Sequence, residues 1–377
     1  MWTDPGPVWT GPLARERALV DSLVGDRAGD WDVAGLLPVE VLRELGGRGL
    51  LCAQVPTAYG GAGLDSLANG ELTAHTGGRC GSLRSVMTSQ GMAAWAIQRL
   101  AGEDRRREYL AALAGGQLAA VGLSEPEAGS DLGALATRIR PAGGDVVLDG
   151  HKTWVTAAHY ADLLVVAGRL ADGAAAVVVP TDAPGLSVQR VPHPLGCRAA
   201  GHAHVRLDSV RVPRGNVLGG GPQSLSLLVT TALGYGRLSV AWGCVGILRA
   251  CLAAAAEHAA VRRQFGRPLA GHQLVGRHLA DLLVAEQVAT RACEHASRCW
   301  DARSPEVVVA TVLAKYVGAT QAVRGAAAAV QVLASAGAVD GHAVARAYRD
   351  AKLMEIIEGS NEICQLMLAQ HLVTVAG

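Results

Sequence analysis

The sequence predicts an α+β chain of three successive units: an N-terminal helical domain over residues 1–117, a middle antiparallel β domain over 118–222, and a C-terminal four-helix-bundle domain over 223–377. Apolar residues make up 50% of the chain and aromatic residues only 4%, so the core must be built from Ala, Leu and Val, which suits close-packed helices. From about Gln117, short β-branched runs separated by Gly, Asp and Pro replace the helical spacing. After Pro222 the helical spacing returns.

Composition excludes several classes of protein. A net charge of +1 indicates neither a nucleic-acid footprint nor an acidic tail. No apolar run reads as long enough to span a membrane, and the first residues, MWTDPGPVWTGP, lack the basic-then-apolar pattern of a signal peptide. The eight cysteines form no CxxC pair and no spacing with His typical of a metal site, which favours reduced, buried thiols. We therefore expect a cytoplasmic protein with no bound metal.

In the N-terminal domain, residues 1–11 form a loose lead-in rich in Pro, Gly and Trp. Pro38 begins a short helix that Gly46-Gly47 ends. The glycine-rich loop Val55–Leu64 follows. Residues 82–100 form a long helix whose inward side chains are Met87, Ala94 and Ile97.

Two motifs lie in the β domain. The run VGLSEPEAGSD, Val121–Asp131, leaves a strand and enters a loop of small residues, whose backbone N–H groups and hydroxyls could hold phosphate or the polar edge of a cofactor. Alone, it could equally be a Ser turn. The run HKTWVTAA, His151–Ala158, places Trp154 and Thr156 on a strand, where a lone Trp is more often a core residue.

The C-terminal domain begins with a long Ala-rich helix, 223–260, that carries Arg237. It is followed by VRRQFGRPLAGHQLV, Val261–Val275, which holds the chain's one Phe and an arginine fork of the kind that suits pyrophosphate. Further helices are expected over 272–300 and 305–338.

The stretch Tyr348–Met367, YRDAKLMEIIEGSNEICQLM, predicts two helices broken by a turn. Gly359 ends the first helix, and Ser360 or Asn361 caps the second. Glu358 is thereby held at a helix end, where burial would raise its pKa and suit it to act as a general base. The alternative is that Glu355, Glu358 and Glu362 form an ordinary solvated face.

Four motifs together carry a family resemblance. The chain resembles the acyl-CoA dehydrogenase family over nearly its whole length. The motifs occur in that family's order: SEPEAGSD, TWVT, RRQFG, and last YRDAK with IIEGSNEI. The resemblance implies an FAD-dependent oxidoreductase acting on acyl thioesters, with Glu358 as the catalytic base. It also implies that Trp154 covers the flavin ring and that Thr156 lies beside its N5 atom.

The resemblance further implies that FAD is completed by a neighbouring subunit, so the protein would be a homo-oligomer, with dimer and tetramer both open. Two glycines usual in that segment are Ala334 and Ser335 here, which leaves the adenine contacts open. The expected substrate contacts are Ser130, Arg237 and Gly359. The expected FAD contacts are Val121, Leu123, Ser124, Trp154, Val155, Thr156, Arg262, Gln264, Phe265, His272, Gln273, Gln331, Ser335, Ser360 and Glu362.

Within the family, the chain most resembles the dehydrogenases that make methoxymalonyl extender units for polyketide antibiotics. The runs that carry this are MTSQGMAAW, CRAAGHA and VAWGCVGILRA. Such enzymes act on a three-carbon, glyceryl-derived acyl group carried by an acyl carrier protein. Oxidation at C3 would then lead toward hydroxymalonyl-carrier protein, with the alcohol and aldehyde steps both open. Arg105–Arg107 would most simply be solvated, but could also steer an acidic carrier protein.

Three alternatives remain at this stage: an acyl-CoA α,β-dehydrogenase for short-chain CoA thioesters, a flavin oxygenase or nitroalkane-type oxidase, and a flavin-free scaffold that binds a carrier protein. Oxidases of the second kind usually lack a glutamate at the position of Glu358. The intact flavin motifs argue against the third. The sequence identifies no electron acceptor.

Overall fold

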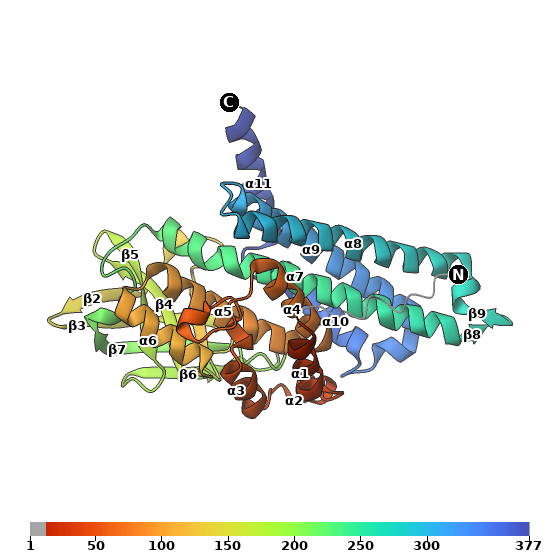
Figure 1. The fold of residues 1–377 in the computed structure, drawn as a ribbon, viewed down its shortest axis with the longest axis horizontal. Helices are drawn as coiled ribbons and strands as arrows, with labels where there is room; N and C mark the ends of the chain where they lie inside the picture. Colours follow the sequence, from red (N-terminus) through yellow and green to blue (C-terminus); the bar gives the residue numbers. More distant parts are fainter. Residues whose placement is uncertain (1–12, 377) are drawn as a thin grey trace.

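The computed structural model describes residues 13–376, so the expected lead-in over 1–11 lies outside the described residues. The β-sheet lies at one end of the molecule and a helical bundle at the other, and the helix α7 (Leu225–Val261) runs between them (Figure 1).

The N-terminal part is helical, as predicted. Helix α3 begins directly after Pro38 and ends at Gly47, and α5 matches the expected long helix to within one residue, with Met87, Ala94 and Ile97 buried. Its elements are α1 (Ala14–Val24), α2 (Ala28–Ala34), α3 (Val39–Gly47), η1 (Leu50–Cys52), η2 (Thr57–Tyr59), α4 (Ser66–Arg79), α5 (Gly81–Leu100) and α6 (Glu103–Ala114).

The middle part is one seven-stranded sheet with the order β1-β4-β2-β3-β7-β6, in which β5 also pairs with β4. The strands are β1 (Ala119–Gly122), β2 (Arg138–Ala142), β3 (Asp145–Val155), β4 (Leu163–Leu170), β5 (Gly173–Pro180), β6 (Leu186–Arg190) and β7 (Ala203–Pro213). The expectation of a purely antiparallel sheet was wrong for two pairings, since β1–β4 and β2–β4 are parallel. Parallel neighbours need a long crossover, and the loop that carries SEPEAGSD is part of the connection that takes the chain from β1 to β4.

The C-terminal part is a bundle in which α7, α8 and α9 pack together, while α10 and α11 pack on α9. Helix α11 projects from the body of the molecule (Figure 1). The helix expected over 305–338 ends at Leu333, because Ala334 adopts a left-handed φ of +52°. The elements are α7, β8 (Arg263–Gln264), β9 (Arg267–Pro268), η5 (Leu269–Gly271), α8 (Gln273–Asp301), α9 (Val307–Leu333), η6 (Ala334–Ala338), α10 (Ala343–Met354) and α11 (Asn361–Ala376). The short turns η3 (Leu132–Ala134) and η4 (Arg214–Asn216) complete the chain.

Helix α7 corrects the expectation that no apolar run could span a membrane. By length and composition alone, this 37-residue helix is long and apolar enough to cross a membrane. However, 72% of its most apolar window is buried inside the protein, so α7 is a core helix. It packs against α4, α5, α8, α9 and α10, which places it at the centre of the molecule.

The bundle core confirms the expectation drawn from composition, since it consists largely of buried Ala, Cys, Val and Leu around Trp242. All eight cysteines are free and buried, as expected of reduced thiols. Close helix approach depends on small residues: a Cβ on Gly246 of α7 would lie 2.1 Å from the carbonyl oxygen of Ala74 on α4.

Candidate active site

Glu358 lies in the turn between α10 and α11. The predicted break between two helices is present, but α10 ends at Met354 and not at Gly359, so Glu358 stands four residues beyond the helix end. Glu358 and Gly359 have left-handed φ values of +56° and +90°, so the turn reverses the chain over two residues. A left-handed conformation is unfavourable for a residue with a side chain, and it aims the Glu358 side chain into the protein rather than along the helix surface. Ser360 is the cap of α11: its Oγ accepts from the Ile363 N–H at 3.4 Å.

The Glu358 carboxylate lies against α7 and α5. Its Oε2 atom is buried and has no hydrogen-bond partner. A Cβ on Gly236 of α7 would lie 2.3 Å from this Oε2 and 2.9 Å from the Met92 sulfur of α5, so the glycine leaves the space that the carboxylate occupies. Burial raises the pKa of Glu358 to about 7, against the lowering effect of Arg237, Lys315 and Arg84. A carboxyl group with this pKa exchanges a proton readily near neutral pH.

The neighbouring carboxylates have other surroundings. Glu355 forms an ion pair with Lys352 at 2.7 Å. Glu362 is exposed, and a hydrogen bond from Ser360 lowers its pKa. A single solvated face of three glutamates, the alternative considered for this stretch, is therefore not present.

Arg237 is buried in α7 rather than on the surface. Its Nε donates to the Glu358 carbonyl oxygen at 3.1 Å, so it holds the turn through the main chain. A Cβ on Gly359 would lie 3.5 Å from an Arg237 terminal nitrogen. Two of the three expected substrate contacts, Arg237 and Gly359, are thus brought together at Glu358.

Trp154 and Thr156 lie at the end of β3. Trp154 has a left-handed φ of +53° and its side chain is 52% exposed, which is unusual for a strand Trp in a core and leaves the indole face available to a planar group. Thr156 Oγ1 hydrogen-bonds His202 Nδ1 at 3.2 Å, and the Thr156 carbonyl accepts from Ser89 Oγ of α5 at 2.9 Å. Val155, between them, is buried in the core.

Helix α5 joins this strand end to Glu358. Ser89 holds Thr156, and Met92, one helical turn further on, lies beside the space that the Glu358 carboxylate fills. The exposed indole, the threonine hydroxyl and the buried carboxylate are therefore parts of one site.

Two residues of this site were missed by the sequence analysis. His202 is buried, its Nε2 has no hydrogen-bond partner, and burial lowers its pKa to about 4, so the imidazole is neutral. Ser89 is equally buried. The one sequence signal for His202 was its place in the run CRAAGHA, which carried the resemblance without assigning a role to the histidine.

The SEPEAGSD loop is fixed by a buried ion pair that was also missed. Lys152 Nζ donates to Glu125 Oε1 at 2.7 Å and to the Leu123 carbonyl at 3.0 Å. Burial lowers the pKa of Lys152 to about 8, opposed by Glu125. The signal lay in the alternation of β3, where 146, 148 and 152 face inward, because an inward-facing lysine needs a carboxylate partner.

The loop itself presents polar groups at the surface. The Ser124 carbonyl accepts from the Thr153 N–H at 2.9 Å, which ties the loop to the strand that carries Trp154. Ser130, further along, is exposed. Val121 and Leu123 are half-buried and pack beside Met92 and Tyr235, so they border the site.

A second group of predicted residues lies at the other end of α7. A cavity of about 780 Å³ brings together four of the expected FAD contacts with the end of α9. Those four are Arg262, Gln264, Gln331 and Ser335. Phe265, beside them, is 95% exposed, and His272 Nε2 is 3.2 Å from the Gln264 carbonyl oxygen. Gln273 begins α8.

The two groups of residues lie far apart within one chain. Gly236, under Glu358, and Arg262 are 26 positions apart along α7, about 39 Å at the usual helical rise.

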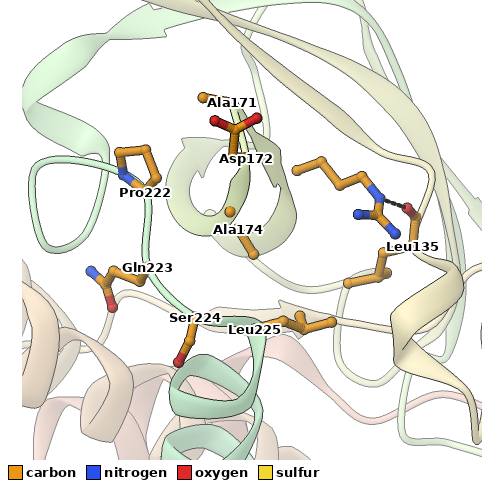
Figure 2. A pocket seen from close by; sticks show the side chains of 10 residues that line it. Leu135, Ala171, Asp172, Ala174, Pro222, Gln223, Ser224 and Leu225 are labelled. Carbon is orange, nitrogen blue, oxygen red and sulfur yellow. Dashed lines mark hydrogen bonds between the residues drawn. The ribbon is translucent and has the colours of Figure 1, made fainter.

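A further cavity of about 570 Å³ lies where the β4–β5 turn meets the start of α7, and Figure 2 shows the residues that line it. Arg169 Nε donates to the Leu135 carbonyl at 2.6 Å there. None of the predicted site residues lines this cavity, so it is separate from the site around Glu358.

The structure also places His295, Cys299 and Glu306 so that their ligand atoms lie within 4.8 Å of one another, although His295 and Glu306 are exposed. This differs from the expectation of no cluster of Cys with His: His295 and Cys299 lie one helical turn apart on α8, and Glu306 lies in the turn before α9.

Fold and site together are those of an FAD-dependent oxidoreductase acting on acyl thioesters. Family models of the acyl-CoA dehydrogenase N-terminal, middle and C-terminal domains match residues 14–117, 120–210 and 227–373. The chain belongs to the acyl-CoA dehydrogenase family.

Individual relatives agree over nearly the full length. The chain is 60% identical to a solved structure described as FkbI, for biosynthesis of the methoxymalonyl extender unit of a polyketide immunosuppressant, with a TM-score of 0.91 over 95% of this chain and 99% of that one. It is 33% identical to probable acyl-CoA dehydrogenase YngJ of Bacillus subtilis, covering 96% of this chain and 98% of that protein. Glutaryl-CoA dehydrogenase from Mycobacterium smegmatis is 30% identical, with a TM-score of 0.90 over 96% and 95% of the two chains.

Proposed function

We propose that this protein oxidises C3 of a glyceryl-derived three-carbon acyl group on an acyl carrier protein, toward hydroxymalonyl-carrier protein for methoxymalonyl extender-unit supply. The observation that carries the proposal is the 60% identity to FkbI over 95% of this chain, together with Glu358, whose Oε2 atom is buried and has no hydrogen-bond partner. We place the protein in the cytoplasm, where carrier-protein chemistry takes place.

The residues present fit FAD. The exposed Trp154 indole offers a flat face, and His202 Nε2 is a buried polar atom without a partner. We propose that Ser124, Trp154 and Thr156 hold the flavin end of the cofactor. When bound, FAD supplies a two-electron acceptor for hydride.

Glu358 then provides the proton transfer. Oxidation of an alcohol at C3 removes a hydride from carbon and a proton from the hydroxyl, and the proton passes to the Glu358 carboxylate. For an aldehyde hydrate, the same two losses leave a carboxylic acid. Because the Glu358 pKa is about 7, the carboxylate form is present at neutral pH and still basic enough to accept the proton.

The remaining part of the cofactor site comes from a neighbouring subunit in this proposal. Arg262, Gln264, Gln331 and Ser335 share one cavity about 39 Å from Gly236, which suits them to hold the pyrophosphate and adenine end of a partner's FAD. Exposed apolar side chains beside this cavity, Val261, Phe265 and Leu274, support an interface there.

The steering role of Arg105–Arg107 stays a proposal. Arg105 pairs with Glu108 at 2.6 Å, and Arg106 and Arg107 both pair with Glu103, at 3.1 and 3.6 Å. These ion pairs reduce the positive charge that the three arginines offer to an acidic carrier protein.

The test of the proposal uses purified holo-protein and glyceryl-carrier protein, with intact-mass measurement of the acyl arm. Loss of two hydrogens marks oxidation of the alcohol to the aldehyde, and a net gain of one oxygen over the aldehyde marks oxidation of its hydrate. A yellow protein that instead turns over butyryl-CoA and ignores the carrier-bound substrate would favour the second candidate, a short-chain acyl-CoA dehydrogenase. That candidate is kept because this chain is 31% identical to the human short-chain specific acyl-CoA dehydrogenase, over 92% of this chain and 85% of the human enzyme. A colourless protein that FAD cannot reconstitute would exclude both.

A further inference from the structure

Lys315 of α9 is fully buried beneath the turn that carries Glu358. Its Nζ donates to the Gly359 carbonyl at 2.7 Å, to Asn361 Oδ1 at 3.1 Å and to the Glu355 carbonyl at 3.3 Å. Burial lowers the pKa of Lys315, but only the ammonium form has three protons to donate, so the three acceptors match the charged form.

All three acceptors belong to the turn or to its immediate helix end. The turn contains the left-handed pair Glu358 and Gly359, and such a conformation is unfavourable at a non-glycine residue unless its surroundings hold it. Arg237 holds the Glu358 carbonyl from α7, and Lys315 holds the carbonyls on either side of it from α9. The turn is therefore fixed from two helices by two buried cations.

No hydrogen bond joins Lys315 to the Glu358 carboxylate, whose Oε2 has no partner. Any effect of Lys315 on that carboxylate acts through the main chain and through charge. We propose that Lys315 is a positioning residue, which keeps the turn in its left-handed form and places a fixed positive charge beneath the Glu358 carboxylate. This inference rests on the proposed role of Glu358 as the base.

The charged groups that act on Glu358 come from three elements: Arg237 of α7, Lys315 of α9 and Arg84 of α5. Each lowers the pKa of Glu358 against the effect of burial. The thiols that face Lys315 are Cys364 of α11 and Cys244 of α7, and burial raises the pKa of both, so they stay neutral. Removing the Lys315 charge must therefore raise the pKa of Glu358.

The experiment measures anaerobic reduction of the bound flavin by substrate across pH 5.5 to 9. Lys315→Met is expected to keep its flavin, to lose tenfold or more in the limiting rate because the base is misplaced, and to shift the pH midpoint upward. The matched control is Lys352→Met, which removes an exposed lysine whose Nζ contacts the Glu355 carboxylate at 2.7 Å and no carbonyl of the turn. It should keep both the rate and the midpoint.

Two further variants separate charge from contact and carry the test should Lys315→Met fail to fold. Lys315→Arg keeps the charge, so its midpoint should stay near that of the natural protein while its rate falls. Lys315→Gln loses the charge, so its midpoint should rise. The inference would be overturned if a folded Lys315→Met or Lys315→Gln variant kept the natural rate of flavin reduction and its pH midpoint, in an assay in which Glu358→Gln is inactive. An active Glu358→Gln would instead refute the proposed base, a separate result.

Discussion

At the scale of single residues, the site depends on one carboxylate kept from its usual partners. Glu358 is the central case: its main-chain carbonyl is held by Arg237, while its Oε2 is left buried and unpaired. Glu125 has different surroundings, since it accepts hydrogen bonds from Lys152 Nζ and from the N–H groups of Thr137 and Ala136. An unpaired buried carboxylate is costly to the fold, and its retention is what a base requires.

Glu358→Gln removes the base and keeps the shape. We expect unchanged flavin content and a loss of flavin reduction of about a hundredfold or more, the usual contribution of a general base. Rapid-mixing absorbance measurements test this, with Glu355→Gln as the control, because Glu355 is paired with Lys352. Near-normal flavin reduction in Glu358→Gln, together with impaired reduction in Glu355→Gln, would show that Glu355 and not Glu358 is the base.

The raised pKa of Glu358 also predicts how stability depends on pH. The pKa of Glu358 is about 7 in the folded protein, against an ordinary value of 4.5. Between these two pH values the folded protein therefore binds more protons than the unfolded chain. The free energy of unfolding falls as pH rises through that window. Glu358→Gln should therefore raise the melting temperature at pH 8 and leave it nearly unchanged at pH 4, as calorimetry would show. An equal shift at both pH values would mean that ionisation of Glu358 carries no cost in stability.

At the scale of elements, glycines on α7 and an ion pair in the sheet set the shape of the site. Gly236 is the sharpest case, because a single methyl group there would overlap the Glu358 carboxylate. Gly236→Ala should keep the helix, which alanine favours by about 1 kcal/mol, yet lower flavin reduction at least tenfold by displacing Glu358. Gly234→Ala is the matched control, since its Cβ would lie 3.6 Å from Trp300, an ordinary contact. Equal rates in both variants would show that the carboxylate can move aside.

The buried pair of Lys152 and Glu125 holds the SEPEAGSD loop against β3. Lys152→Met leaves Glu125 buried without its cation, so we expect a loss of about 3–5 kcal/mol in unfolding free energy and weaker FAD binding. Urea denaturation and flavin titration measure the two effects. The double variant Lys152→Met, Glu125→Gln should recover part of the unfolding free energy that Lys152→Met loses. A Lys152→Met variant as stable as the natural protein would contradict the role of the ion pair.

The elements also show what sequence alone can and cannot foresee. The bounds of α3 were predictable from Pro38 and Gly47, because proline fixes φ at a helix start and glycine favours a helix end. The end of α10 was not, since the helix stops at Met354, five residues before Gly359. The parallel pairing of β1 with β4 was not, since it depends on which strands meet after a long connection. The motif residues of the site were found through resemblance, whereas Lys152, His202 and Lys315 act through partners far away in the sequence and were missed.

At the scale of the whole molecule, the two halves of the proposed cofactor site lie at opposite ends of one chain. A chain with Glu358→Gln and a chain with Arg262→Ala should each be inactive alone. In mixed symmetric dimers, one site takes Glu358 from one chain and Arg262 from the other and is intact, so equal mixing should restore about a quarter of the natural activity. Refolded mixtures assayed for flavin reduction test this. Mixtures that stay inactive, while the natural protein treated in the same way recovers, would show that each chain builds its site alone.

The unbroken length of α7 has a consequence for how this protein can change over time. One inserted residue would turn everything beyond it by about 100° and move it by about 1.5 Å, so Gly236 and Arg262 would no longer face their respective sites together. Apart from close-packed glycines such as Gly236 and Gly246, substitutions along α7 can be absorbed one at a time, but insertions and deletions cannot. We therefore expect the spacing between these two residues to be inherited as a fixed number, while the loops around the sheet vary freely in length.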